Sequence, residues 1–179
     1  MFLRRELYFS EFDVKGTGNM KIIFLDIDGV LNYQGCPEIL YGSYFVEDEK
    51  IALLKQIVDA TGAKIVLSSS WRDGWCDQEN GEETVIRDMY EALVEKLKEY
   101  GLELYDKTPY EEERATEIAV WLDDSYGCKG DFVDDFVILD DLAPENFGKH
   151  LAEHLAHTDF MDGGLKEEHV RQAIEILNR

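Results

Sequence analysis

Apolar and polar positions follow two different periods along the chain. Short apolar runs bounded by polar or turn residues predict buried strands, and longer stretches with an apolar residue at every third or fourth position predict helices. The predicted strands are residues 21–25, 64–67, 102–105, 136–139 and, as a weak edge strand, 155–158. The predicted helices are residues 47–61, 82–100 and 165–177, a stretch that starts at Thr108, and a short stretch around His150. This alternation is typical of an α/β fold with a mostly parallel sheet between two layers of helices.

The segments between these elements are predicted from local signals. Thr108, Pro109 and Glu111 are residue types favoured at the N-cap, N1 and N3 positions, so we predict that a helix starts at Thr108. Residues 71–81 are polar and contain glycine, which predicts a loop. Residues 123–135 are acidic and are also predicted to be a loop.

The pattern predicts one folded domain at residues 20–179. Residues 1–19 mix aromatic and charged residues without a clear period and end in a glycine-containing turn, so we interpret them as an N-terminal extension without a defined fold. An extra strand at Leu7–Phe9 is the alternative. A chain of 179 residues is long enough to bury a substantial core within one domain.

Composition limits the partners that the protein can bind. Eighteen basic and 39 acidic residues give a formal net charge of −21, which argues against non-specific binding to nucleic acid or to an anionic membrane. A phosphorylated substrate would therefore need a local cation. The chain has no apolar run of about 20 residues and no signal-peptide pattern. Its three cysteines lack the spacing of a zinc site, so we predict a cytoplasmic protein with reduced thiols.

Polar side chains follow three of the predicted strands at the point where each strand ends. Asp26 and Asp28 follow the first strand, Ser68–Ser70 the second, and Asp140 and Asp141 the fourth. Carboxyl ends of parallel strands meet at one edge of a sheet, where such folds bind their ligands. Side chains alternate along a strand, so the first two carboxylates point the same way and repel each other. Such a pair indicates a bound cation, or catalysis in which one carboxylate attacks and the other transfers protons.

These motifs, taken together, resemble those of the haloacid dehalogenase-like (HAD) superfamily of phosphohydrolases. Leu25-Asp26-Ile27-Asp28-Gly29-Val30 is similar to the first motif of that superfamily. The resemblance implies that Asp26 is the nucleophile and Asp28 the general acid and base, and that the reaction is phosphoryl transfer. It also implies a Rossmann-like three-layer α/β/α sandwich. An Asp-x-Asp pair alone also occurs in glycosyltransferases, but the order of the other motifs favours a phosphatase.

The remaining motifs imply roles for further residues, with an alternative at each position. Ser69 would bind the transferring phosphoryl group, with Ser68 as the alternative. The basic residue of the third motif would be Arg114, or Lys107, although Arg114 could instead form a surface ion pair. The metal site would bind Mg²⁺ through the carboxylate of Asp26, the backbone carbonyl of Asp28 and a carboxylate of the fourth motif. We favour Asp140 over Asp141 as that last ligand.

The chain is also similar to a group of small HAD domains that lack a cap domain, some of which are attached to RNA-repair proteins. The space between the first two strands holds only one loop and one helix, so a cap does not fit there. Capless relatives tend to have open sites that accept large substrates, so we expect a phosphorylated substrate that is small or bulky. Residues 33–44 and 71–75 would form the rim of the site. We expect a Mg²⁺-dependent phosphatase that forms an aspartyl-phosphate. The alternatives are a nucleotide or nucleic-acid end phosphatase and a phosphate-binding regulatory domain with little turnover. Arg72 would contact the distal part of the substrate or pack the loop.

Overall fold

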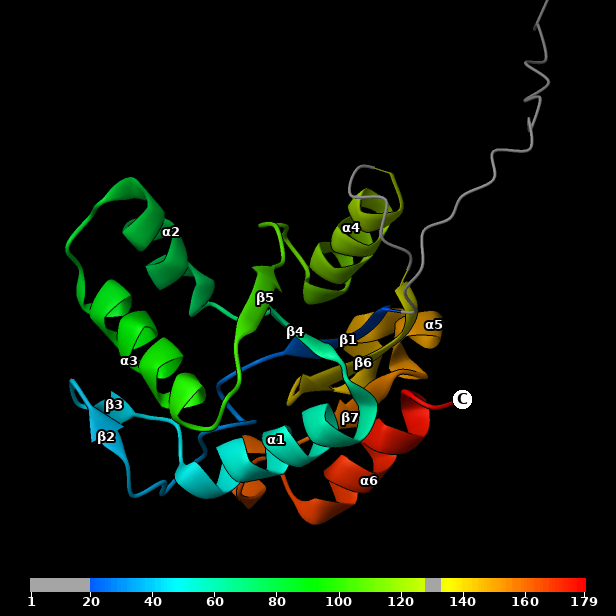
Figure 1. The fold of residues 1–179 in the computed structure, drawn as a ribbon, viewed down its shortest axis with the longest axis horizontal. Coiled ribbons are helices and arrows are strands. Elements are labelled where there is room, and N and C mark those ends of the chain that lie inside the picture. The colour runs from blue at the N-terminus through cyan, green and yellow to red at the C-terminus, as the bar shows by residue number, and fades with distance from the viewer. Residues whose placement is uncertain (1–19, 128–132) are drawn as a thin grey trace, which may run out of the picture.

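A five-stranded parallel sheet forms the centre of the protein (Figure 1). The computed structural model describes residues 20–127 and 133–179. The sheet has the strand order β5-β4-β1-β6-β7, and every neighbouring pair is parallel. The chain starts in the middle, proceeds to one edge, and then crosses to the other side of its first strand. The strands are β1 (Met20–Leu25), β4 (Lys64–Leu67), β5 (Leu104–Lys107), β6 (Val133–Asp140) and β7 (Leu155–His157).

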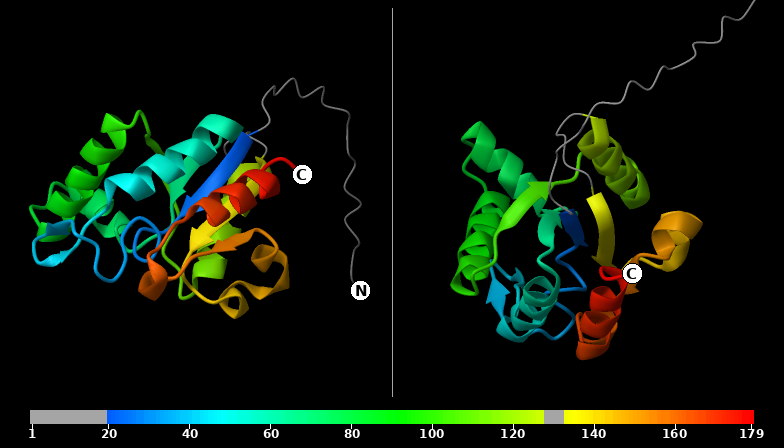
Figure 2. Two further views of the ribbon diagram at one scale, coloured as in Figure 1. Left: turned by 90° about the horizontal axis from the view of Figure 1, so that it is seen from below. Right: turned by 45° about the vertical axis from the view of Figure 1, so that its right-hand side comes forward.

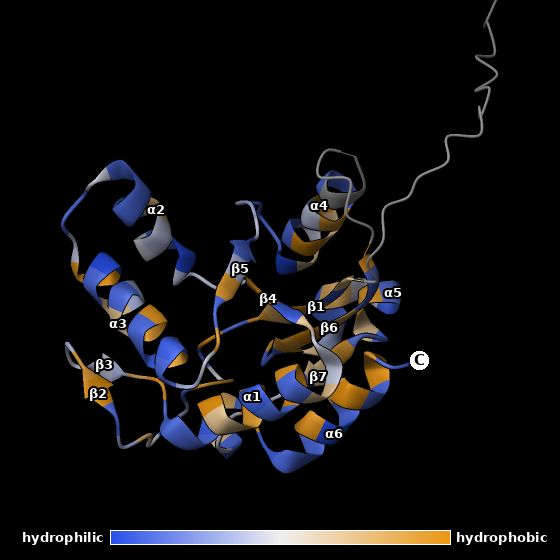
Figure 3. Ribbon diagram, in the orientation of Figure 1, coloured by the Kyte–Doolittle hydropathy of each residue, from blue (hydrophilic) through white to orange (hydrophobic). Residues whose placement is uncertain are grey.

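Helices cover both faces of this sheet and confirm the predicted three-layer α/β/α sandwich (Figure 2). One face carries α1 (Asp48–Thr61), α3 (Val85–Glu99) and α6 (Glu167–Ile176). The other face carries α4 (Arg114–Gly127), the 3₁₀ turn η1 (Pro144–Phe147) and α5 (Gly148–Ala152). Figure 3 shows that the helices contain both hydrophobic and hydrophilic residues, whereas β1 and β6 are mostly hydrophobic. No helix in residues 20–127 or 133–179 is long and apolar enough to cross a membrane.

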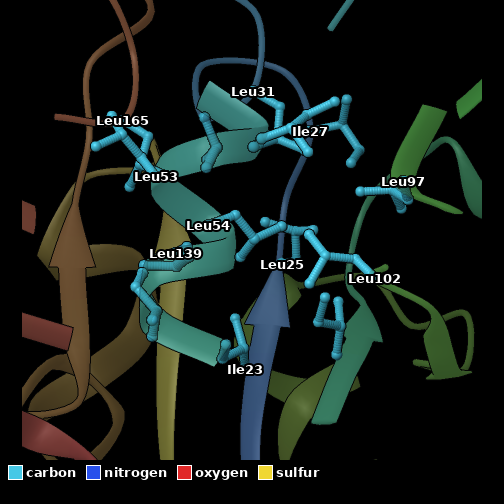
Figure 4. Close-up of a cluster of buried hydrophobic side chains, with 14 of the residues drawn as sticks. Ile23, Leu25, Ile27, Leu31, Leu53, Leu54, Leu97, Leu102, Leu139 and Leu165 are labelled. Carbon is cyan, nitrogen blue, oxygen red and sulfur yellow. The ribbon is translucent and has the colours of Figure 1, made fainter. Parts of the chain in front are cut away.

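The alternating side chains of β1 build a core on each face of the sheet. Ile23 and Leu25 are fully buried against the face that carries α1. Ile22 and Phe24 are fully buried on the opposite face, where the Phe24 ring meets Trp121 edge to face at a centroid distance of 5.3 Å. Burial on both faces explains why β1 is an uninterrupted apolar run. Figure 4 shows the first of these clusters, which includes Leu54, Leu97, Leu102, Leu139 and Leu165.

Two local predictions are wrong. A helix, α2 (Arg72–Asn80), replaces the predicted polar loop. It packs on α3 so closely that a Cβ atom on Gly74 would lie 2.4 Å from the carbonyl oxygen of Ile86. Tertiary packing thus stabilises a helix whose own sequence has no apolar period. The second error concerns Thr108, which is not an N-cap because its N–H donates to the Leu67 carbonyl and extends the edge of the sheet, while α4 begins only at Arg114.

Other loops differ from the prediction in smaller ways. The loop after β1 contains a hairpin of two short antiparallel strands, β2 (Ile39–Leu40) and β3 (Ser43–Tyr44). Helix α4 and β6 shorten the predicted acidic loop from both ends. A second 3₁₀ turn, η2 (Phe160–Asp162), precedes α6. The alternative strand at Leu7–Phe9 lies outside the described residues. Between β1 and β4 the chain has only the hairpin and α1, so the described part of the fold has no cap domain there.

Candidate active site

The polar residues at the carboxyl ends of β1, β4 and β6 meet at one edge of the sheet. Leu25, the last residue of β1, pairs with Leu67 on one side and with Leu139 on the other, so the three strands end at the same edge. The N–H of Asp26 donates to the Leu139 carbonyl over 2.9 Å, and the N–H of Ser68 donates to the Leu25 carbonyl over 2.8 Å. The chain direction across the sheet reverses between β1 and β6, and ligands bind at such switch points in α/β folds.

Three aspartates form a tight cluster at this edge. Asp26, Asp140 and Asp141 each offer a carboxylate oxygen, and these oxygens lie within 4.8 Å of one another. Asp26 exposes 7% of its surface and Asp140 only 1%. Burial raises the pKa of Asp26 to about 7, with Arg114 opposing the rise and Asp140 adding to it. Burial and the nearby Asp140 also raise the pKa of Asp141. The fold therefore holds carboxylates together where their negative charges are unfavourable.

Arg114, the first residue of α4, supplies one positive charge to the cluster. Its Nη1 lies 2.8 Å from Asp140 Oδ2 and 3.6 Å from Asp26 Oδ1, and it also donates to the Ser68 carbonyl. When all three aspartates are ionised, three negative charges against one guanidinium leave two uncompensated. One divalent cation would neutralise them, and clustered carboxylate oxygens are the ligands that Mg²⁺ prefers. The residues present thus fit the metal that the HAD resemblance implies.

The structure does not bring Lys107, the alternative basic residue, to this cluster. Its Nζ lies 2.8 Å from Glu79 Oε2 and 4.4 Å from the centroid of the Trp75 ring. Lys107 is the last residue of β5, but its side chain pairs with residues of α2. Of the two candidates, only Arg114 contacts the aspartates.

A buried ion pair between Arg72 and Glu117 contacts Arg114 at its Nε atom. Arg72 donates to both carboxylate oxygens of Glu117, with Nη1 2.9 Å from Oε2, and to the hydroxyl of Thr108 over 3.0 Å. Glu117 Oε2 lies 3.5 Å from Arg114 Nε, and Arg72 and Glu117 expose only 6% and 4% of their surfaces. Arg72 is therefore held by buried side-chain contacts within the protein, as the packing alternative predicts. The ion pair predicted as the alternative role of Arg114 is also formed, with the buried Glu117. Arg114 makes this contact in addition to its contacts with Asp26 and Asp140.

Ser68 and Ser69 follow β4 with buried side chains. Neither hydroxyl has a hydrogen-bond partner of good geometry among the described residues. The Ser69 hydroxyl nevertheless lies beside Asp26, where it lowers the pKa of that carboxyl. A buried hydroxyl without a partner is unfavourable, and a phosphate oxygen would supply one. Ser69 is therefore the better placed of the two, while Ser68 offers its backbone carbonyl to Arg114.

Asp28 differs from the clustered aspartates because it is exposed and held by two side chains. Its Oδ1 accepts from Asn32 Nδ2 over 2.7 Å, and its Oδ2 accepts from Trp71 Nε1 over 3.1 Å. Asn32 is fully buried and also accepts from the Gly29 N–H over 3.2 Å, which closes the turn after β1. Sequence reasoning gave no role in the site to Asn32 or to the Trp71 N–H.

Gly29 allows the turn after β1 to approach the aspartate cluster. Its φ angle is +77°, a left-handed conformation that glycine adopts without strain. A Cβ atom at this position would lie 2.3 Å from Asp141 Oδ2. The glycine of the Asp-x-Asp-Gly motif is therefore required by the close approach of Asp141.

Comparison with known proteins agrees with this fold and site. The chain matches, over residues 22–170, the family described as HAD domain in Swiss Army Knife RNA repair proteins. The matched range covers most of the 179 residues and includes every side chain of the site described above. No curated protein matches the chain. The chain therefore belongs to this family of HAD domains, within a superfamily of phosphatases and other hydrolases.

Proposed function

We propose that the protein is a Mg²⁺-dependent phosphomonoester hydrolase in which Asp26 carries the phosphoryl group. The observation that carries this proposal is the arrangement of Asp26, Asp140 and Asp141 around Arg114 at the sheet edge, with the buried Ser69 hydroxyl beside Asp26. These groups provide a nucleophile, a cation site and phosphate-binding donors within one small space.

The metal site would consist of Asp26, Asp140 and Asp141, with the backbone carbonyl of Asp28 as the further expected ligand. Mg²⁺ bound there supplies positive charge that reduces the repulsion between an anionic nucleophile and an anionic phosphate. Arg114 alone leaves this repulsion only partly compensated. Loss of the cation should therefore slow phosphoryl transfer.

Phosphoryl transfer then proceeds in two steps. In the first step, a carboxylate oxygen of Asp26 attacks phosphorus, the bond from phosphorus to the leaving oxygen breaks, and that oxygen takes a proton from Asp28. In the second step, Asp28 takes a proton from water, the water oxygen attacks phosphorus, and the bond to Asp26 breaks with release of inorganic phosphate. Asp28 is suited to both transfers because its carboxyl group is exposed and its direction is set by Asn32 and Trp71.

Positioning of the phosphoryl group falls to Ser69, with Ser68 as the alternative, and to Arg114. The Arg114 guanidinium is held by Glu117 at Nε and turned toward the cluster at Nη1. Donors fixed in this way stabilise the charge on the equatorial oxygens without reorganising during the reaction. Lys107 has no part in this proposal because it pairs with Glu79.

Mg²⁺ dependence is the first test. Phenyl phosphate should be hydrolysed in the presence of Mg²⁺, stop being hydrolysed after addition of a chelator, and be hydrolysed again when excess Mg²⁺ is restored. Unfolding monitored in the same buffers would separate loss of activity from loss of structure. Tight Mg²⁺-dependent binding of a phosphate analogue without turnover would instead support a phosphate-binding regulatory domain.

The family description favours a second candidate, because it names RNA repair proteins. A nucleic-acid end phosphatase should hydrolyse a 5′- or 3′-phosphorylated oligonucleotide with a higher kcat/KM than phenyl phosphate. The net charge of −21 argues against this preference, because each additional phosphate of the substrate is repelled. Measuring both substrates in parallel distinguishes the two functions.

Trp71→Phe tests the role assigned to Asp28. The substitution removes the indole N–H that donates to Asp28 but keeps an aromatic ring in the same packing position. We expect kcat to fall about tenfold with little change in melting temperature, because a misdirected general acid loses part of its contribution. Trp75→Phe is the matched control, since Trp75 stacks on Tyr90 at 5.7 Å rather than contacting Asp28. Equal kcat values for the two variants would argue against the assigned role.

A further inference from the structure

A pocket of about 870 Å³ opens beside the aspartate cluster. Asp28 and Asp141 line one part of it, so the pocket is continuous with the proposed reaction centre. The hairpin of β2 and β3 and the start of α3, which lie near each other in Figure 1, form two of its other walls. The start of α2 and the turn η2 complete the lining. The Tyr41 hydroxyl in the hairpin donates a hydrogen bond of 3.1 Å to Asp88 Oδ2 in α3 and so connects the two elements. The volume greatly exceeds that of a phosphate group and is typical of sites for small organic ligands.

The walls of this pocket are largely apolar. Ile39 and Ile86 expose 54% and 42% of their surfaces, although both are large aliphatic residues. Exposed aliphatic side chains grouped in a concave site indicate a ligand that covers them. The apolar and aromatic lining residues come from four separate parts of the chain and are Ile39, Tyr44, Trp71, Ile86, Met89 and Phe160.

The charged residues of the pocket are all acidic. Asp28, Asp73 and Asp141 are among the lining residues, and none of the described residues that line it is basic. Binding of polyanions such as nucleic acid requires lysine or arginine contacts along the path of the chain. An additional phosphate or carboxylate on the substrate would here lie near carboxylates, in a protein whose net charge is already −21.

From the proposed phosphatase function, on which this step rests, we infer that the pocket binds the leaving group of the substrate and that this group is apolar, of ring size or larger, and without negative charge. Asp28, the residue that protonates the leaving oxygen, is part of the pocket wall, which places the leaving group on this side of the phosphate. The substrate class is thus a monophosphate ester of an uncharged aromatic or aliphatic alcohol, rather than a polynucleotide end or a nucleoside polyphosphate.

Three aryl esters and an oligonucleotide test this substrate class. Phenyl and 2-naphthyl phosphate have leaving groups of similar acidity, so a difference in kcat/KM reports contact with the second ring. We expect about a tenfold higher kcat/KM for the naphthyl ester, since burial of an additional ring adds apolar contact. The carboxylate of 4-carboxyphenyl phosphate should lower kcat/KM about tenfold relative to phenyl phosphate through like-charge repulsion. A phosphorylated oligonucleotide should be the poorest substrate.

A pair of neighbouring variants assigns these effects to the pocket. Ile86→Lys places a positive charge in the wall, so it should abolish the naphthyl preference and raise the relative kcat/KM for the carboxyphenyl ester. Val85→Lys is the matched control, because Val85 is similarly exposed at 53% and adjacent in α3 but is not part of the lining. It should keep the wild-type order of substrates.

A binding measurement separates failure of this inference from failure of the proposed function. Calorimetry with 2-naphthylmethylphosphonate, which cannot be hydrolysed, should show weaker binding to Ile86→Lys than to wild type and Val85→Lys. Hydrolysis of all aryl esters at equal kcat/KM, or preference for the oligonucleotide, would overturn the inference and leave the phosphatase intact. Phosphonate binding that depends on Ile86 in a protein that hydrolyses none of the esters would overturn the phosphatase proposal and keep the pocket. If the protein neither bound the phosphonate nor hydrolysed any ester, both the pocket inference and the phosphatase proposal would be overturned.

Discussion

Asp26→Asn is expected to lower kcat for phenyl phosphate by about 10³-fold or more, because the amide lacks the anionic oxygen that attacks phosphorus. Asparagine has nearly the same shape as aspartate, and its side-chain oxygen can still accept from the Ile27 N–H, which donates to Asp26 Oδ1 over 2.8 Å. The fold should therefore be kept. The loss should appear in kcat at saturating substrate as well as in kcat/KM.

Steady-state kinetics and thermal unfolding of the same preparation check this expectation. Asp134→Asn is the matched control, since Asp134 is an exposed aspartate near the opposite end of β6. It should retain wild-type kcat. If Asp26→Asn kept more than a tenth of the wild-type kcat while Mg²⁺ dependence persisted, another residue would have to be the nucleophile.

The second large effect concerns stability. Arg72→Met should lower the free energy of unfolding by about 3–5 kcal/mol, because it leaves the Glu117 carboxylate buried without its main partner. Both side chains are almost fully buried, and the pair connects the start of α2 with α4. The contact that Glu117 makes with Arg114 at 3.5 Å cannot replace the two oxygen contacts from Arg72.

Urea unfolding of three variants distinguishes a buried pair from an ordinary surface pair. Lys55→Met breaks the exposed pair of Lys55 and Asp59, whose atoms are 2.8 Å apart, and should cost less than about 1 kcal/mol. The double variant Arg72→Met/Glu117→Met should recover much of the stability lost in Arg72→Met, because the Glu117 carboxylate is then no longer left buried without its partner. If Arg72→Met lowered the free energy of unfolding no more than Lys55→Met, the stabilising role of the buried pair between Arg72 and Glu117 would be contradicted.

The central strands of the sheet were predictable because they carry runs of residues buried on both faces. The apolar run of β1 follows from the position of this strand at the centre of the sheet, and the carboxylate of Asp26 comes directly after it. Helix α2 was not predictable in the same way. Its stability comes from the packing of Gly74 on α3 and from the buried guanidinium of Arg72, and neither produces an apolar period. At Thr108, residue types that favour a helix start were outweighed by pairing of its backbone with β4.

In the candidate site as well, some residues could be predicted from the sequence and others could not. Topology alone brings Asp26, Asp140 and the serines after β4 to one edge, so their convergence could be predicted from strand order. The direction of a long side chain cannot be predicted from spacing, and this direction separates Arg114 from Lys107. The contacts of Trp71 with Asp28 and of Arg72 with Glu117 join residues 43 and 45 positions apart, and no local pattern encodes them.

The claim that Asp26 carries the phosphoryl group is tested most directly by trapping the covalent intermediate. Asp28→Asn should slow hydrolysis of the aspartyl-phosphate. With an aryl phosphate whose phenol is acidic, the phenolate leaves without protonation by Asp28, so the intermediate still forms. The phosphorylated protein should therefore accumulate. Acid quenching followed by peptide mass spectrometry should find the phosphoryl group on Asp26, only when Mg²⁺ is present, and never in the Asp26→Asn variant. A phosphoryl group on another residue, or continued turnover with no protein-bound phosphate, would contradict the mechanism.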